Sequence, residues 1–198
     1  MSFRWGFKAE AERIAAELRE ELNLSLDHRL DPLTLARHLC IPVLEIGRLA
    51  ALLGEPGLGN YFLIEDVDSL SALTLFFGSR RTIVHNESHA PTRQVSNLAH
   101  EISHCILEHV PEPLLRPDGH RCWNEVVEAE ATWLAGALLV PRAGALELAR
   151  RGMEDDLIAR HFGVSTPLCR WRMNETGISS QLKRYGNLRR TGSRAAAG

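Results

Sequence analysis

The segment Leu98–His104 constrains this chain more than any other, because it places two histidines and a glutamate on one predicted helix. It reads Leu-Ala-His-Glu-Ile-Ser-His, with apolar residues at helical spacing around the polar ones. Residues four apart share a helix face, so the imidazoles of His100 and His104 can reach one metal ion. Glu101 lies one position round the helix from His100, where its carboxylate can hold a water beside the metal. The spacing therefore predicts a metal site.

The surrounding sequence favours such a site over a surface helix that merely carries two histidines. The motif lies inside a predicted helix from about Pro91 to Val110, and a strand-like segment precedes it. A second predicted helix, Asn124–Val140, supplies acidic residues, and a loop rich in proline and glycine, residues 111–119, lets the two helices pack side by side. A catalytic zinc site needs a third protein ligand and one open position.

Three glutamates of the second predicted helix are candidates for the third ligand. Glu128 and Thr132 share a strip next to an apolar stripe, so they can point at a site at the edge of the core. Glu130 lies about 200° round the helix from Glu128, and Glu125 about 300°. We expect Glu130 to be solvated and keep Glu125 as the second choice. The stripe consists of Val127, Ala131, Leu134 and Leu138.

Two segments resemble the ImmA/IrrE family of zinc metallo-endopeptidases. Residues 97–104 read Asn-Leu-Ala-His-Glu-Ile-Ser-His, and residues 128–141 read Glu-Ala-Glu-Ala-Thr-Trp-Leu-Ala-Gly-Ala-Leu-Leu-Val-Pro. These are similar to the family's H-E-[IL]-[GS]-H motif and its E-x-x-A-[ND]-x-F-A-x-x-L-L-M-P helix. Residues 82–86 also resemble the strand that precedes the family's motif. The resemblance is close over residues 80–141 and loose over residues 8–180.

The resemblance implies a zincin-like core with one Zn²⁺ per chain. His100, His104 and Glu128 match the family's zinc ligands, and Glu101 matches its catalytic carboxylate. Thr132 stands where the family has Asn or Asp; its hydroxyl can orient a ligand, but more weakly than a carboxylate would.

The resemblance also implies a function, that of a zinc-dependent endopeptidase. Such an enzyme would cut a specific regulatory protein, typically a helix-turn-helix repressor, in a stress, phage-defence or mobile-element response. The alternative hypothesis is a DNA- or partner-binding regulator whose zinc site is structural or vestigial. Glu101 favours the enzyme, because a structural zinc site needs no general base.

Several other residues are candidates for roles around the metal. A Cys122 thiolate can occupy the open zinc position and inhibit the enzyme, since thiolates bind zinc well; the alternative is a plain loop cysteine. His120 is a candidate oxyanion donor, and Tyr61 is another. We expect Cys105 to point away from the metal. Three further histidines are predicted to be at the surface or to support the ligands: His85, His89 and His109.

Composition limits where such a chain works. Its 198 residues are 44% hydrophobic and 24% charged, which suits a soluble globular protein. No apolar run is long enough to cross a membrane, and residues 1–22 are too charged for a signal peptide. The four cysteines form no C-x-x-C pair, so free thiols in a reducing cytoplasm are expected.

The remaining patterns predict an α+β fold, a helical bundle with a small, mostly antiparallel sheet. Helices are expected at Lys8–Leu22 and from Asp31, as N-cap, to Leu39. A hairpin turn is expected at Gly78–Arg81. We assign residues 1–150 to the metallopeptidase domain. The predicted strands are Ile41–Ile46, Tyr61–Ile64, Leu70–Phe77 and Thr82–His85.

The C-terminal part, residues 151–188, is expected to form a separate helical segment. Asp155–Thr176 resembles a helix-turn-helix. From Arg170 to the end there are seven basic residues and one acidic residue, so Arg170 and Arg172 are candidate nucleic-acid contacts. The alternative is a helical pair that packs on the catalytic domain or docks a partner. Residues 189–198 are expected to be a disordered tail.

Overall fold

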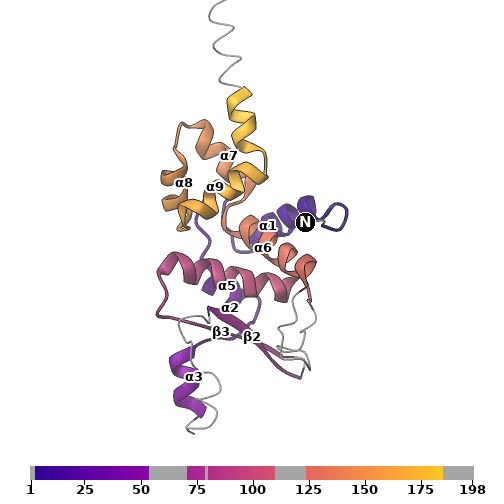
Figure 1. The fold of residues 1–198 in the computed structure, drawn as a ribbon, viewed down its shortest axis with the longest axis vertical. Coiled ribbons are helices and arrows are strands. Elements are labelled where there is room, and N and C mark those ends of the chain that lie inside the picture. Colours follow the sequence, from indigo (N-terminus) through magenta and orange to yellow (C-terminus); the bar gives the residue numbers. More distant parts are fainter. Residues whose placement is uncertain (1–2, 54–70, 79, 110–123, 185–198) are drawn as a thin grey trace, which may run out of the picture.

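A mixed three-stranded sheet lies between α5 (Pro91–Ile106) and α3 (Ile46–Leu53) in the lower half of the molecule as drawn in Figure 1. The computed structural model describes residues 3–53, 71–78, 80–109 and 124–184. Strands β1 (Val43–Glu45), β2 (Ala72–Phe77) and β3 (Arg80–His85) are arranged in the order β1-β3-β2. The helices and this sheet together confirm an α+β fold.

The pairing of the strands differs from the expectation of a mostly antiparallel sheet. β2 and β3 are antiparallel and form the predicted hairpin, with Gly78 at a φ of 63° where glycine is favoured. β1 pairs parallel to β3, with Val43 opposite Ile83. No hairpin joins β1 to β3, and a strand that arrives through a long connection can pair in parallel. Sequence patterns close to β1 do not show its direction.

Four of the predicted helices are present, and their ends lie close to the predicted ends. They are α1 (Phe7–Glu21), α2 (Pro32–His38), α5 (Pro91–Ile106) and α6 (Glu125–Leu139). At the start of α2, the Asp31 side chain accepts hydrogen bonds from the backbone N–H groups of Leu33 and Thr34, as its N-cap position predicts. α5 is shorter than expected, because Glu108 adopts a left-handed φ of 53° that ends the helix.

Of the other four helices in the described residues, α3 and α7 (Arg142–Arg150) were not predicted, whereas α8 (Asp155–Phe162) and α9 (Thr166–Glu175) were predicted as part of the C-terminal segment. α3 begins where the predicted first strand ends and so shortens it, and α7 follows α6 directly. Both are short, and short apolar segments do not distinguish helix from strand. α8 and α9 lie within the segment expected to contain a helical pair.

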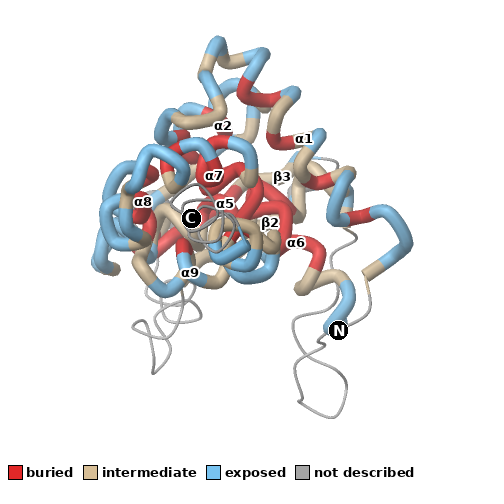
Figure 2. Tube along the Cα trace, turned by 90° about the horizontal axis from the view of Figure 1, so that it is seen from above, coloured by how far each residue is buried: buried red, intermediate tan, exposed pale blue. Residues whose placement is uncertain are grey.

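The helices form successive layers above the sheet. α5 contacts β2 and β3, α6 packs along α5, and α1 packs along α6 (Figure 1). Buried residues gather around α5 and α6 in the middle of the molecule (Figure 2). One apolar cluster joins α1, α5 and α6, and a second joins the end of α6 to α7, α8 and α9. α6 therefore belongs to both clusters and is the central helix.

Some expectations concern residues outside the described ranges. They are the strand Tyr61–Ile64, the start of the strand at Leu70, the loop 111–119 and the tail 189–198. The division at residue 150 stays a prediction. Among the described residues, no helix is long and apolar enough to cross a membrane.

Candidate metal centre

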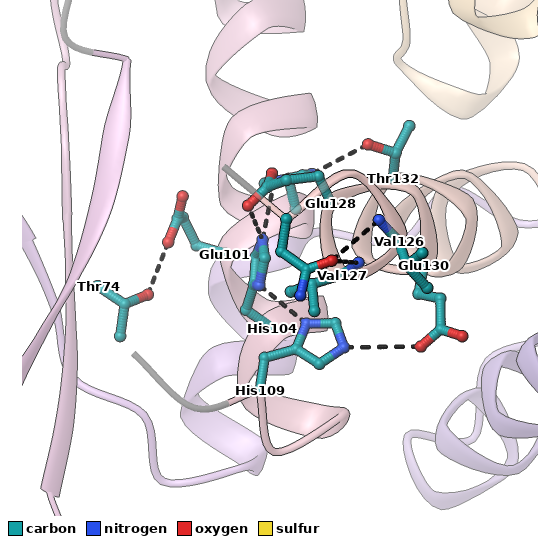
Figure 3. Close-up of polar contacts among 11 residues, drawn as sticks. Thr74, Glu101, His104, His109, Val126, Val127, Glu128, Glu130 and Thr132 are labelled. Atoms are coloured by element: carbon teal, nitrogen blue, oxygen red, sulfur yellow. Dashed lines mark hydrogen bonds and ion pairs between the residues drawn. The ribbon is translucent and has the colours of Figure 1, made fainter. Parts of the chain in front are cut away.

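Three side chains from α5 and α6 converge on one point. His100 Nε2 lies 3.1 Å from Glu128 Oε2 and 3.0 Å from His104 Nε2, and His104 Nε2 lies 3.6 Å from Glu128 Oε1. The two histidines are one helical turn apart on α5. Glu128 reaches them from the first turn of α6 (Figure 3). All three residues are partly buried, so the point stays within reach of solvent.

The donor set and its spacing fit a tetrahedral metal ion. Two ligand atoms that share a zinc ion at about 2.0–2.1 Å lie about 3.4 Å apart. The ligand atoms of the three residues all fall within 4.8 Å of one another. Two imidazole nitrogens and one carboxylate are also a donor combination of catalytic zinc sites, which keep a fourth position open. The cluster therefore suggests a bound metal ion.

The Glu128 carboxylate is kept ionised by its neighbours. Burial favours its neutral form, but hydrogen bonds and charges from His100 and His104 outweigh burial and lower the pKa of Glu128 to about 2. An ionised carboxylate needs to release no proton before it binds a cation. The charge state that a metal ion requires is thus present at neutral pH.

The second nitrogen of each histidine faces another side chain. His100 Nδ1 lies 3.4 Å from Thr132 Oγ1 on α6, and His104 Nδ1 lies 2.9 Å from His109 Nδ1 just after α5 (Figure 3). Groups that hold the outer nitrogen orient a ligand imidazole. Thr132 thus faces His100, a candidate ligand, from the strip of α6 that it shares with Glu128.

Glu101 lies on the sheet side of α5. The Thr74 hydroxyl on β2 donates to Glu101 Oε2 at 2.7 Å, and Figure 3 shows the carboxylate directed at that strand. Thr74 was not singled out from the sequence. The available signal was a single hydroxyl within the apolar strand Ala-Leu-Thr-Leu-Phe-Phe.

One expectation about neighbouring residues was wrong, and a second was narrowed. Glu130 was expected to be solvated, but only 7% of it is exposed, and its carboxylate faces Arg4 at 3.4 Å and His109 at 3.8 Å. The N-terminal segment before α1 covers this side of α6 and buries it. Of the two places expected for His85, the surface is excluded, because the residue is buried in β3. Glu125 is exposed in the first turn of α6 and is not in the cluster.

Arg172 does not fit a nucleic-acid contact. Only 1% of it is exposed, and its guanidinium pairs with Glu12 of α1, so the expectation that it meets phosphates is corrected. Arg170 is exposed and lies 3.6 Å from Asp155. Whether α8 and α9 bind DNA stays a prediction that now depends on Arg170.

The other candidates give mixed outcomes. Cys122, His120 and Tyr61 lie outside the described residues. Cys105 packs against the core cluster, and burial raises the pKa of its thiol, in keeping with a packed cysteine.

The chain matches a known family over more than half of its length. Residues 61–174 match the model of Peptidase_M78, described as the IrrE N-terminal-like domain. None of the curated proteins matches the chain. The matched segment contains His100, Glu101, His104 and Glu128, together with β2, β3 and the helices from α5 into α9. The resemblance seen in the two motifs is therefore confirmed, and the chain belongs to the Peptidase_M78 family of IrrE N-terminal-like domains.

Proposed function

We propose that this peptidase is a zinc-dependent endopeptidase that cuts one regulatory protein, a helix-turn-helix repressor, in a stress, phage-defence or mobile-element response. The observation that carries the enzymatic part is the convergence of His100, His104 and Glu128 next to Glu101. The substrate class rests on the resemblance to the ImmA/IrrE family.

In this proposal, His100, His104 and Glu128 hold the metal. When bound, zinc would polarise the scissile carbonyl and make a water acidic enough to lose a proton near neutral pH. Glu101 would take that proton as the water oxygen attacks the carbonyl carbon, and would pass it to the amide nitrogen as the C–N bond breaks. Because Thr74 donates to Oε2, Oε1 is the oxygen assigned to the proton.

We assign the binding of the substrate to β2. Within the described residues β2 is an outer strand of the sheet, and it carries the Thr74 hydroxyl that meets Glu101. An extended peptide can add to an outer strand through main-chain hydrogen bonds. A substrate paired in this way would run past Glu101, with its scissile bond close to the ligand cluster.

Zinc content tests the ligand assignment. We expect one zinc per purified wild-type chain and a clear loss in Glu128→Ala, because two imidazoles alone leave the site incomplete. Glu125→Ala is the matched control, since it removes an exposed carboxylate from the first turn of the same helix. Elemental analysis gives the ratio of zinc to protein. A wild-type protein without zinc after reconstitution would overturn the proposal.

The role of Glu101 is tested by Glu101→Gln. We expect this variant to keep its zinc and lose cleavage by a factor of at least about 100, because the amide cannot accept the proton. The assay is intact-mass analysis of helix-turn-helix repressors encoded near this gene after incubation with the zinc-loaded protein. Cleavage at the wild-type rate would refute the general-base role. Binding of a repressor without any cut would instead favour the alternative of a regulator with a vestigial site.

A further inference from the structure

His109, three residues after the end of α5, is turned back onto the helix that carries His100 and His104. The backbone N–H of His109 donates to the carbonyl of His104 at 3.1 Å, and that of Glu108 donates to Cys105 at 3.2 Å. These two bonds form a Schellman motif, with Glu108 in the left-handed position that glycine usually takes. A non-glycine residue in this conformation costs about 1 kcal/mol or more. The motif holds the His109 side chain over the last turn of α5.

The His109 ring links the outer nitrogen of His104 to a buried carboxylate. His109 Nδ1 lies 2.9 Å from His104 Nδ1, and His109 Nε2 lies 3.8 Å from Glu130 Oε2 (Figure 3). The first distance is a hydrogen bond, and the second is an electrostatic contact. Glu130 also faces Arg4 Nε at 3.4 Å, and Arg4 pairs with Glu10 of α1 at 3.1 Å. A chain of polar groups thus runs from His104 to the N-terminal segment.

The order of the groups determines where the protons lie. A histidine that binds metal through Nε2 must carry its proton on Nδ1 and donate it. The acceptor at this position is His109 Nδ1, which can accept only if the His109 proton is on Nε2. That proton faces the Glu130 carboxylate, which stabilises it there. Each group therefore selects the tautomer of the next, and the lone pair of His104 Nε2 is left for the metal.

We propose that His109 and Glu130 form a positioning relay that holds His104 in its metal-binding tautomer and orientation. The inference rests on the proposed function, because it assumes that His104 binds zinc. The relay differs from the support of His100, whose Nδ1 faces the hydroxyl of Thr132 at 3.4 Å. It assigns Glu130, which the cluster itself does not use, a role toward the metal.

Zinc affinity, measured by competition with a chromophoric chelator, tests the relay. We expect His109→Phe to weaken zinc binding by about 10- to 100-fold, the usual effect of removing a partner of a ligand histidine. His109→Gln should recover most of the affinity, because its amide oxygen can accept the His104 proton. Glu130→Gln should weaken binding less, and its effect should vanish in the His109→Phe background, since both act through one path. Glu108→Gly keeps the turn and is the matched control, with unchanged affinity expected.

The outcomes separate the relay from the metal site itself. If His109→Phe binds zinc as tightly as wild type while Glu128→Ala loses it, the relay is wrong and the site stands. If His109→Gln is as weak as His109→Phe, an acceptor for the His104 proton does not restore zinc binding, and the relay is overturned. If wild type binds no zinc, the proposed function fails and the relay fails with it. The visible spectrum of the cobalt-loaded protein gives a second readout, and the relay predicts a changed spectrum in His109→Phe but not in Glu108→Gly.

Discussion

Two carboxylates on α6, only two residues apart, have different surroundings. Glu128 is partly buried beside His100 and His104, which keep it ionised with a pKa of about 2. Glu130 points to the other side of the helix, where Arg4 and His109 face it. Burial and the neighbouring His104 lower the pKa of His109 to about 4. The role of each carboxylate therefore depends on the side chains of other elements that lie next to it.

Thr74 gives a prediction at the same scale. Thr74→Val removes the hydroxyl that donates to Glu101 but keeps the β-branched shape of the side chain. We expect zinc content to be unchanged and kcat to fall about tenfold, because a hydrogen bond to a charged group contributes about 1.5–3 kcal/mol and part of that loss reaches the transition state. Thr82→Val, a partly buried threonine on the neighbouring strand, is the control. An unchanged kcat in Thr74→Val would show that the contact does not position Glu101.

At the scale of the element, the start of α6 matters most for the site. The Asn124 side chain accepts hydrogen bonds from the backbone N–H groups of Val126 and Val127, at 3.2 Å and 3.4 Å. Glu128 is one turn further along, so the N-cap holds the turn from which the carboxylate projects. α2 begins with an equivalent N-cap at Asp31, but that helix supplies no residue of the ligand cluster.

This pair of N-caps allows a matched test. Asn124→Ala and Asp31→Ala should each lower the free energy of unfolding of the metal-free protein by about 1 kcal/mol, the usual cost of losing an N-cap. Only Asn124→Ala should also weaken zinc binding, because only its helix carries a ligand in the next turn. Asn124→Ser should behave like wild type. Urea denaturation and zinc competition give the two quantities, and equal zinc affinities in both alanine variants would contradict the argument.

At the scale of the whole molecule, buried arginines tie the C-terminal helices to α1 and α6. Arg172 of α9 pairs with Glu12 of α1 and donates from Nε to the carbonyl of Val140 at 3.3 Å. α9 approaches α6 so closely that a Cβ on Gly136 would lie 2.6 Å from Arg172 Cδ. Arg19 of α1 in turn donates to the carbonyl of Leu138 at 2.8 Å. The C-terminal end of α6 is thus bonded from both sides, by α1 and by α9.

Removal of the Arg172 pair should destabilise the whole fold. Arg172→Met keeps much of the apolar contact but removes the charged partner of the Glu12 carboxylate, which is partly exposed and still accepts from the backbone N–H of Arg142. We expect a loss of about 1.5–3 kcal/mol in the free energy of unfolding, the contribution of a hydrogen bond to a charged group. Arg160→Ala is the control, because Arg160 forms an exposed pair with Asp156 at 2.7 Å and should contribute less than about 1 kcal/mol. Both are measured by urea denaturation. A loss in Arg172→Met no larger than that of the control would show that the pair does not join the helices.

Features that depend on residues close together in the chain could be predicted from the order of the amino acids. Helical spacing placed His100 and His104 on one face, and the Asp31 side-chain cap marked the start of α2. The apolar stripe of α6 correctly directed Glu128 toward them. These features depend on helix periodicity and local hydrogen bonds, which a linear pattern records.

The surroundings of those residues depend on the packing of distant elements and could not be predicted in this way. The burial of Glu130, the contact of Thr74 with Glu101 and the pairing of Arg172 with Glu12 each join elements far apart in the sequence. The parallel direction of β1 depends in the same way on a long connection. A side chain's periodicity shows which face of its helix or strand it occupies, but the group that meets that face is set by the packing of other elements.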